Sequence, residues 1–309
     1  ETYGQYELSG QVSSLAIPAT LQDSLMARLD RLVTAKGVAQ YASVIGRQFS
    51  YTLLREVSQL DEATLQRELG RLVEAELIYQ RGLPPQATYI FKHALIQDTA
   101  YETLLRRTRR GYHRRIAEVM TERFPETAEA QPELIAHHYT AAGMNEQAIG
   151  YWHKAGQRAA ERSANVEAIS HLTQGLEIVR TLPETPENNQ LELLLLTALG
   201  PALMATKGQA APEAEHTYAQ ALKLCQQVGD TPQLFTVLDG LQRFYNVRGD
   251  YETAWELGEQ LLAHAQRQND TSLFLSAHQA LGTSAFYIGA LTEAQDHFKQ
   301  GIVLYDAQQ

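Results

Sequence analysis

Histidines, one cysteine and a run of arginines are the side chains of this chain that are best suited to chemistry. His137 and His138 are adjacent, so on a helix they face different directions and make poor joint metal ligands. Cys225 lies in an apolar helical run, which indicates core packing rather than a nucleophile. No Ser-His-Asp or Cys-His signature is present. The remaining histidines of the second part are scattered, without zinc-site spacing: His153, His171, His216, His264, His278 and His297. The sequence therefore predicts no catalytic residue and no metal site.

A basic cluster lies after residue 105, on an expected pair of helices. It mixes arginines with apolar residues and spreads around much of the helix circumference. Its members are Arg106, Arg107, Arg109, Arg110, His113, Arg114 and Arg115. One interpretation is a solvated face that pairs with acidic neighbours, since surface charge runs are common. The other is a contact with nucleotide phosphates or with an acidic partner domain, and the sequence leaves both open.

The elements that position these residues in the first part read as short helices followed by a hairpin. Amphipathic or short apolar segments predict helices over residues 21–32, 36–45, 51–58 and 62–75, and Asp61 is placed to cap the last of these. A hairpin follows, with strands over 77–80 and 88–91. Three helices followed by a two-stranded wing describe a winged-helix domain.

A winged helix raises the hypothesis of DNA binding, and its charges test that hypothesis. Residues 61–76 would enter the major groove, and they carry five acidic residues against Arg67 and Arg71, a net charge of −3 (2 − 5). Such a helix repels phosphates. We therefore expect no DNA binding by this face, and a transcriptional regulator is kept as the alternative function.

The second part repeats a helix-ending pattern. Gly143, Gly249 and Gly289 are each followed five residues later by an alanine that leads an amphipathic run. A glycine in the left-handed conformation can end one helix before the next begins. The spacing of glycines, alanines and aromatic residues resembles a tetratricopeptide (TPR) array, a stack of helix pairs built to bind other molecules. Equivalent alanines at 148, 168, 214, 254 and 294 give steps of 20, 46, 40 and 40. The short step predicts an irregular first repeat whose helix over 152–162 is bent or shared.

Most aromatic residues of these helices are expected to pack between helices, with one member of each pair Phe244/Tyr245 and Phe286/Tyr287 leaving the core. A ligand groove is predicted at Arg243, Tyr245, Asn246, Arg248 and Tyr287. Its expected ligand is a protein or peptide. The last apolar segment, residues 302–306, has no polar capping helix after it, which predicts an array that is truncated at its C-terminus.

Composition separates the two parts. Residues 1–130 carry 16 Lys+Arg and 16 Asp+Glu, whereas residues 131–309 carry 10 and 20, so the net charge of −10 lies in the second part. We predict a linker over 1–20, the winged helix and connecting helices over 21–130, and the repeat array over 131–309. A single cysteine and the absence of a long apolar segment favour a cytoplasmic protein without membrane contact.

Several segments together resemble the signalling ATPases of the STAND class, at the junction between winged helix and sensor array. The clearest is YIFKHALIQDTAY over 89–101; IPATL (17–21), HRRIA (113–117), AHHY (136–139), AIGYWHKAG (148–156) and RSAN (162–165) agree with it. The bacterial members that it resembles often carry cyclase or kinase domains ahead of the ATPase. In that class a winged-helix histidine contacts the phosphate of bound ADP, and His93 holds the matching place. A helix-starting histidine that caps the wing is the equal alternative.

One departure from the class is decisive. No G-x-x-x-x-G-K-[ST] motif occurs, so the phosphate-cradling loop and its lysine are absent. The expectation is a mainly α chain, with a winged helix and a TPR-like solenoid, that has no enzymatic activity and no cofactor of its own. It would regulate an upstream nucleotide-binding domain, and ADP or ATP would bind in the full-length protein.

Overall fold

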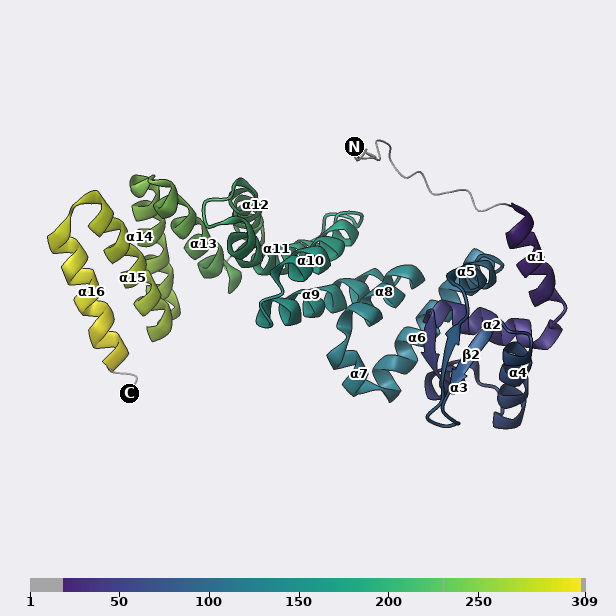
Figure 1. The fold of residues 1–309 in the computed structure, drawn as a ribbon. Coiled ribbons are helices and arrows are strands. Elements are labelled where there is room, and N and C mark those ends of the chain that lie inside the picture. Colours follow the sequence, from purple (N-terminus) through teal and green to yellow (C-terminus); the bar gives the residue numbers. More distant parts are fainter. Residues whose placement is uncertain (1–18, 230, 307–309) are drawn as a thin grey trace, which may run out of the picture. The chain divides into compact units, whose positions relative to one another are not determined.

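The computed structural model describes residues 19–229 and 231–306, and the chain divides into two compact units, residues 1–125 and 126–309 (Figure 1). Each unit is described by itself. The linker expected over residues 1–20 lies almost entirely outside the described residues, and so do the first two residues of the segment IPATL (17–21). None of the helices described is long and apolar enough to cross a membrane.

Unit 1 combines six helices with a small antiparallel sheet in its described part. Its elements are α1 (Ala19–Asp30), α2 (Val33–Ile45), β1 (Gln48–Ser50), α3 (Tyr51–Ser58), α4 (Glu62–Glu74), β2 (Ile78–Arg81), β3 (Thr88–Phe91), α5 (Ala94–Glu102) and α6 (Arg106–Arg123). The strand order is β1-β3-β2, with Gln48 opposite Ile90 and Ile78 opposite Phe91. Strand β1 was not predicted, because its three residues are too short to show an alternating pattern.

Local capping and a buried aromatic group hold these elements in place. The Asp61 carboxylate accepts a hydrogen bond from the backbone N–H of Thr64, which confirms the predicted cap of α4. Phe49 on β1 packs on Tyr89 and Phe91 of β3, with ring centroids 5.7 Å apart in both cases. The single buried residue of the unpredicted strand therefore ties it to the sheet core.

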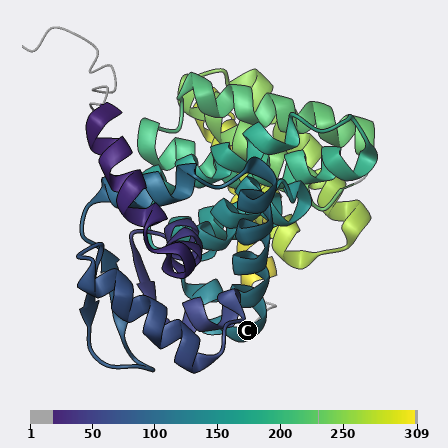
Figure 2. The same ribbon diagram turned by 90° about the vertical axis from the view of Figure 1, so that its right-hand side faces the viewer.

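Unit 2 is a TPR-like helical repeat array in which, from α8 onward, each helix packs against the next (Figures 1 and 2). Its helices are α7 (Pro125–Ala130), α8 (Pro132–Ala142), α9 (Asn145–Glu161), α10 (Asn165–Val179), α11 (Pro186–Lys207), α12 (Pro212–Val228), α13 (Gln233–Arg248), α14 (Tyr251–Gln268), α15 (Thr271–Ile288) and α16 (Leu291–Asp306). Helix α9 packs against both α8 and α10, as the other inner helices of the array pack against their neighbours. The bent or shared helix expected over 152–162 stays a prediction.

The three repeat glycines end helices as expected. Gly143, Gly249 and Gly289 have φ of 74°, 86° and 88° and stand at the C-terminal ends of α8, α13 and α15. This left-handed conformation disfavours residues with a Cβ atom, so glycine reverses the chain there at little cost.

One expectation about the aromatic pairs holds and the other is wrong. Phe244 is buried while Tyr245 is half-buried, but Phe286 and Tyr287 are both exposed, at 56% and 55%. The second pair lies in the last turn of α15, where Tyr287 stacks on Tyr251 of α14 at 5.3 Å between ring centroids. The two tyrosine rings therefore pack on each other at the surface and do not contribute to the core.

Candidate functional site

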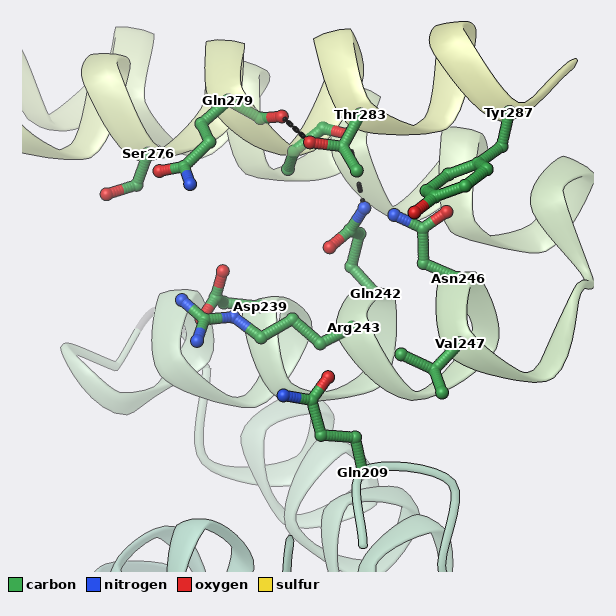
Figure 3. Close-up of a pocket in the computed structure, with 11 residues that line it drawn as sticks. Gln209, Asp239, Gln242, Arg243, Asn246, Val247, Ser276, Gln279, Thr283 and Tyr287 are labelled. Atoms are coloured by element: carbon green, nitrogen blue, oxygen red, sulfur yellow. Dashed lines mark hydrogen bonds and ion pairs between the residues drawn. The ribbon is translucent and has the colours of Figure 1, made fainter. Parts of the chain in front are cut away.

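A cleft of about 330 Å³ lies between α13 and α15, beside the loop that joins α11 to α12 (Figure 3). Residues three or four apart on each helix share one helical face, and this spacing brings polar side chains of both helices to the cleft. The lining consists of Gln209, Asp239, Gln242, Arg243, Asn246, Val247, Ser276, Gln279, Ala280, Thr283 and Tyr287. Carboxamides and hydroxyls dominate it, and both kinds of group donate and accept hydrogen bonds.

Gln242 fixes the spacing of the two helices that form the cleft. Its side chain is buried, and its Nε2 donates hydrogen bonds to the carbonyl oxygen of Ala280 at 3.2 Å and to Oγ of Ser284 at 3.0 Å. Both acceptors are on α15. A buried amide with two partners across an interface holds one helix register, because any slip leaves polar groups unpaired.

One ion pair supplies the charges of the cleft. Arg243 Nη2 lies 3.0 Å from Asp239 Oδ2, one turn earlier on α13. Burial raises the pKa of Asp239, and the neighbouring Arg243 guanidinium opposes that rise. The arginine side chain itself is 60% exposed. It is therefore free to exchange this carboxylate for another that enters the cleft.

Asn246 offers the clearest unused hydrogen-bonding group. Its Oδ1 is buried and has no hydrogen-bond partner among the described residues. Figure 3 shows its side chain and that of Tyr287 pointing toward one another from α13 and α15. Burying an acceptor without a donor costs free energy unless a ligand or water supplies one. This corner of the cleft is therefore suited to an N–H or O–H group of a ligand.

The structure brings together three of the five predicted groove residues: Arg243, Asn246 and Tyr287. The other two bind Glu215 on α12 instead. Tyr245 donates its hydroxyl hydrogen to Glu215 Oε1 at 3.0 Å, and Arg248 Nη1 lies 3.4 Å from Glu215 Oε2. At about 100° per residue around a helix, these two side chains point away from the face that lines the cleft.

The remaining cleft residues were not predicted from the sequence. A signal was present for part of the lining: polar residues recur every three or four positions on α13 (Asp239, Gln242, Arg243, Asn246) and on α15 (Ser276, Gln279, Thr283). Gln209 carries no such signal, because the loop reaches the cleft only through the packing of the helices.

His93 is the N-cap residue of α5 and stands two residues after the end of β3, just after the second wing strand as the sequence indicated. Its side chain is exposed and makes no capping hydrogen bond. The alternative role of a capping histidine therefore receives no support from the side-chain geometry.

Helix α4, which was weighed as a DNA-reading helix, uses its arginines internally. Glu68 is buried and accepts hydrogen bonds from Thr34 Oγ1 at 2.7 Å, Arg67 Nε at 3.0 Å and Arg71 Nη1 at 3.2 Å. Burial alone would raise the pKa of Glu68, but these three donors outweigh it and hold the pKa below its ordinary value. The two arginines are thus committed to a structural carboxylate.

Groups suited to catalysis or metal binding do not gather in the described ranges. No cluster of three or more His, Cys, Asp and Glu side chains there has an arrangement that would hold a metal ion. Cys225 is buried, and burial raises the pKa of its thiol. Such a thiol is a weak nucleophile.

No protein-family model matches the chain. An uncharacterized protein of Rhizobium meliloti (strain 1021) is 28% identical over 291 residues, which cover 93% of this chain and 28% of that relative. The chain thus spans little more than a quarter of the length of the curated relative that it matches.

Among solved structures, nearly identical TPR-like repeats from Podosopora anserina match with a TM-score of 0.48, 19% identity, and coverage of 66% of this chain and 98% of that one. A STAND protein with a tetratricopeptide repeat sensor from Pyrococcus horikoshii matches with a TM-score of 0.45, 12% identity, and coverage of 88% and 50%. These values are too low to transfer the function of either protein.

Proposed function

We propose that the repeat array binds a peptide or protein segment in the cleft between α13 and α15, and that this chain is a regulatory, non-catalytic part of a longer signalling protein of the cytoplasm. The observation that carries the binding proposal is the lining itself. It combines carboxamides, hydroxyls, one exchangeable arginine and an unpartnered acceptor on Asn246. Such a set matches the alternating N–H and C=O groups of a polypeptide backbone.

Two positions in the cleft give the ligand its orientation. Asn246 Oδ1 would accept from a backbone N–H of the ligand and so satisfy the buried acceptor. Arg243 would turn from Asp239 toward a ligand carboxylate, where it can make a bidentate contact. The cleft then holds a peptide with an acidic side chain or free C-terminus at the Arg243 end.

The experiment screens the chain against an array of extended peptides and measures the affinity of the best binder by fluorescence anisotropy. Replacing Arg243 and Asn246 together with alanine should weaken binding by about tenfold or more, since a few residues carry most interface energy. Arg248→Ala and Tyr245→Phe are matched controls, because both lie on α13 but bind Glu215 outside the cleft. Equal losses in the control variants, or no peptide binding at all, would contradict the proposal.

For unit 1 we propose a winged-helix domain that relays nucleotide state, on the basis of the STAND resemblance. Two observations support it: the β1-β3-β2 sheet that accompanies α2, α3 and α4, and the exposed His93 at the start of α5. An imidazole beside helix N-terminal amides suits a phosphate. The partner would be an upstream nucleotide-binding domain holding ADP or ATP, and this chain would hold no cofactor of its own.

The nucleotide role is tested in the full-length protein. His93→Ala should raise basal signalling, because it removes a contact that holds the resting state closed. Arg81→Ala, at another exposed position of unit 1, serves as the control. If His93→Ala and the control leave the same basal activity, the relay role of His93 is refuted.

The alternative of a DNA-binding regulator gains no specific observation. Arg67 and Arg71, the two cations of α4, both contact buried Glu68. A shift of duplex DNA in gel electrophoresis that is selective for sequence and weakened by salt would reverse this judgement.

A further inference from the structure

The basic cluster lies on one helix, not on the expected helix pair. Helix α6 contains seven arginines, no lysine and two glutamates, a net charge of +5 (7 − 2). Residues 1–125 carry 16 Lys+Arg and 14 Asp+Glu, so the remainder of unit 1 has nine and twelve, a net charge of −3. The positive charge of this unit is therefore concentrated on a single element.

Four of these arginines are exposed along one stripe of α6: Arg106, Arg107, Arg110 and Arg114. At about 100° and 1.5 Å per residue they fall within an arc of about 100° and a length of about 12 Å. The adjoining face buries His113, Ile116 and Met120, and the helix packs against α2 and α3. The cluster as a whole spreads around the helix, as the sequence suggested, because Arg109, His113 and Arg115 lie at other angles. Its four exposed arginines nevertheless form one surface, the arginine stripe.

Arg109 belongs to the same cluster but has a structural role. Its Nη2 donates to the carbonyl oxygens of Tyr101 at 3.0 Å and Leu104 at 3.4 Å, and its guanidinium lies 4.1 Å from the centre of the Tyr101 ring. The Tyr101 hydroxyl is in turn 2.9 Å from Nε2 of His113. These contacts fix the turn from α5 into α6 and so hold the N-terminal end of the arginine stripe in a defined direction.

The arginine stripe opposes the stability of its own helix. The first turn of α6 has no acidic residue, and its N-cap Leu105 makes no side-chain capping bond. Cations at the positive end of a helix dipole and like charges four residues apart are both unfavourable. Arg106 and Arg107 have no hydrogen-bond or ion-pair partner among the described residues, whereas Arg114 contacts Glu118 at 3.0 Å. Arg110 also has a contact within the chain. The charges of the arginine stripe therefore oppose the stability of their own helix, and those of Arg106 and Arg107 are available to an external anion.

We propose that the arginine stripe of α6 is a docking surface for an acidic polypeptide segment, whose Asp and Glu carboxylates pair with Arg106, Arg107, Arg110 and Arg114. All the cations are arginines, whose planar guanidinium binds carboxylates through two parallel hydrogen bonds. A nucleic-acid backbone is a poorer match, because it needs a broad basic frame and the rest of unit 1 is net acidic. Gly111 borders the arginine stripe with open space around its Cα, so a partner backbone can approach closely.

The test uses the whole chain and a fluorescent polyglutamate peptide, with anisotropy measured at about 50 and about 200 mM salt. We expect binding that weakens with salt and falls by about tenfold or more in Arg107→Gln/Arg110→Gln, as two charge-assisted pairs are lost. Arg123→Gln is the control: it makes the same kind of substitution once, at an exposed position of α6 that lies outside the arginine stripe. It should change the affinity less than about twofold.

Three outcomes would overturn the proposal: no binding at low salt, equal losses in the control, or tighter binding of single-stranded DNA or tripolyphosphate than of polyglutamate at matched charge. Gly111→Ala adds an independent readout, because alanine favours the helix while its Cβ obstructs close approach. It should raise helix stability and lower peptide affinity together. None of these results depends on the α13–α15 cleft, so the two binding proposals can fail separately.

Discussion

The two units join their helices in different ways. In unit 1, α2 and α4 are linked through a buried carboxylate, Glu68, that is surrounded by Thr34, Arg67 and Arg71. In unit 2 the buried polar groups that join helices are neutral, such as Gln242, and the closest contacts are steric: the Tyr218 ring lies between Gly200 of α11 and Gly240 of α13. In unit 1, which contains helices and strands, a buried charged network fixes how two helices pack. In the array of unit 2, the fit between the side chains of neighbouring helices fixes their packing.

The steric side of this comparison predicts the largest effect. A Cβ atom at Gly240 would overlap Cζ of Tyr218, a buried ring with no room to move because Gly200 faces it from the other helix. Gly240→Ala should therefore destabilise unit 2 by about 2–3 kcal/mol, the upper part of the usual range of overpacking. Urea unfolding followed by tryptophan fluorescence measures this directly, since Trp152 and Trp255 both belong to unit 2.

Gly150→Ala is the matched control for Gly240→Ala. Gly150 lies inside α9 with nothing within 4 Å of an added Cβ, so alanine should stabilise the array by about 0.5–1 kcal/mol. The loss at Gly240 should also shrink in a Tyr218→Leu background, where the ring is absent. If the loss persists there unchanged, the helix contact is not limited by this ring.

The charged side of the comparison predicts the second effect. Glu68→Ala leaves the Thr34 hydroxyl without its acceptor and opens a gap between α2 and α4. We expect unit 1 to lose about 2 kcal/mol. The loss stays below that of a fully buried ion pair, because Arg67 and Arg71 are half exposed and regain water. Circular dichroism should show the unit 1 transition shifted while the tryptophan transition is unchanged.

Exposed Glu74 on the same helix supplies the control for Glu68. Glu74→Ala should change stability by less than about 0.5 kcal/mol. A similar loss in both variants would show that helix propensity, and not the buried network, governs unit 1.

The neutral contact in unit 2 should have a smaller effect than the charged one in unit 1. Gln242→Leu removes the hydrogen bonds to Ala280 and Ser284 and leaves the buried Ser284 hydroxyl oxygen without this donor. The expected cost is about 1–2 kcal/mol, read from the tryptophan transition. Gln279→Leu changes the same residue type at an exposed position of the cleft and should cost little. Equal costs would mean that Gln242 does not set the register of α13 and α15.

The same contrast explains what the sequence could predict. The ends of α8, α13 and α15 follow from Gly143, Gly249 and Gly289, whose conformational preference is local. Strand β1 escaped prediction because its partner β3 lies some 40 residues later and only Phe49 marks its buried side. Sequence patterns therefore predict local structure such as helix ends well, and the pairing of distant strands poorly.

The candidate cleft divides along the same line. Arg243 and Asn246 share one face of α13 by helical periodicity, so their joint presence in a groove could be predicted. That Gln209 joins them, and that Glu215 takes Tyr245 and Arg248 away, depends on how α11, α12 and α13 pack together. The sequence pattern of a single helix does not show how it packs against the other two.

The smallest effect expected from a single side chain is a difference between the two units in how their stability depends on pH. Burial lowers the pKa of His153 and His278 in unit 2, and the neighbouring His297 lowers that of His278 further. The unfolded chain then binds protons that the folded array does not, as the pH falls from 6.5 through the lower folded-state pKa values. Unit 2 should lose stability across this range, while unit 1 depends on Glu68, whose lowered pKa preserves its contribution until the pH falls below 4.5.

His278 isolates one contributor to this slope. Its Nδ1 lies 3.0 Å from Nδ1 of His297, so one ring donates to the other only while the pair is not fully protonated. His278→Gln should make the fall of the tryptophan transition midpoint between pH 7.5 and about 5.5 shallower. His216→Gln, at an exposed position of α12, should leave the slope as in the unaltered chain. A slope that is the same in all three proteins, or a unit 1 transition that falls in parallel with that of unit 2, would show that buried imidazoles do not distinguish the units. The distinction would then rest on steric contacts alone.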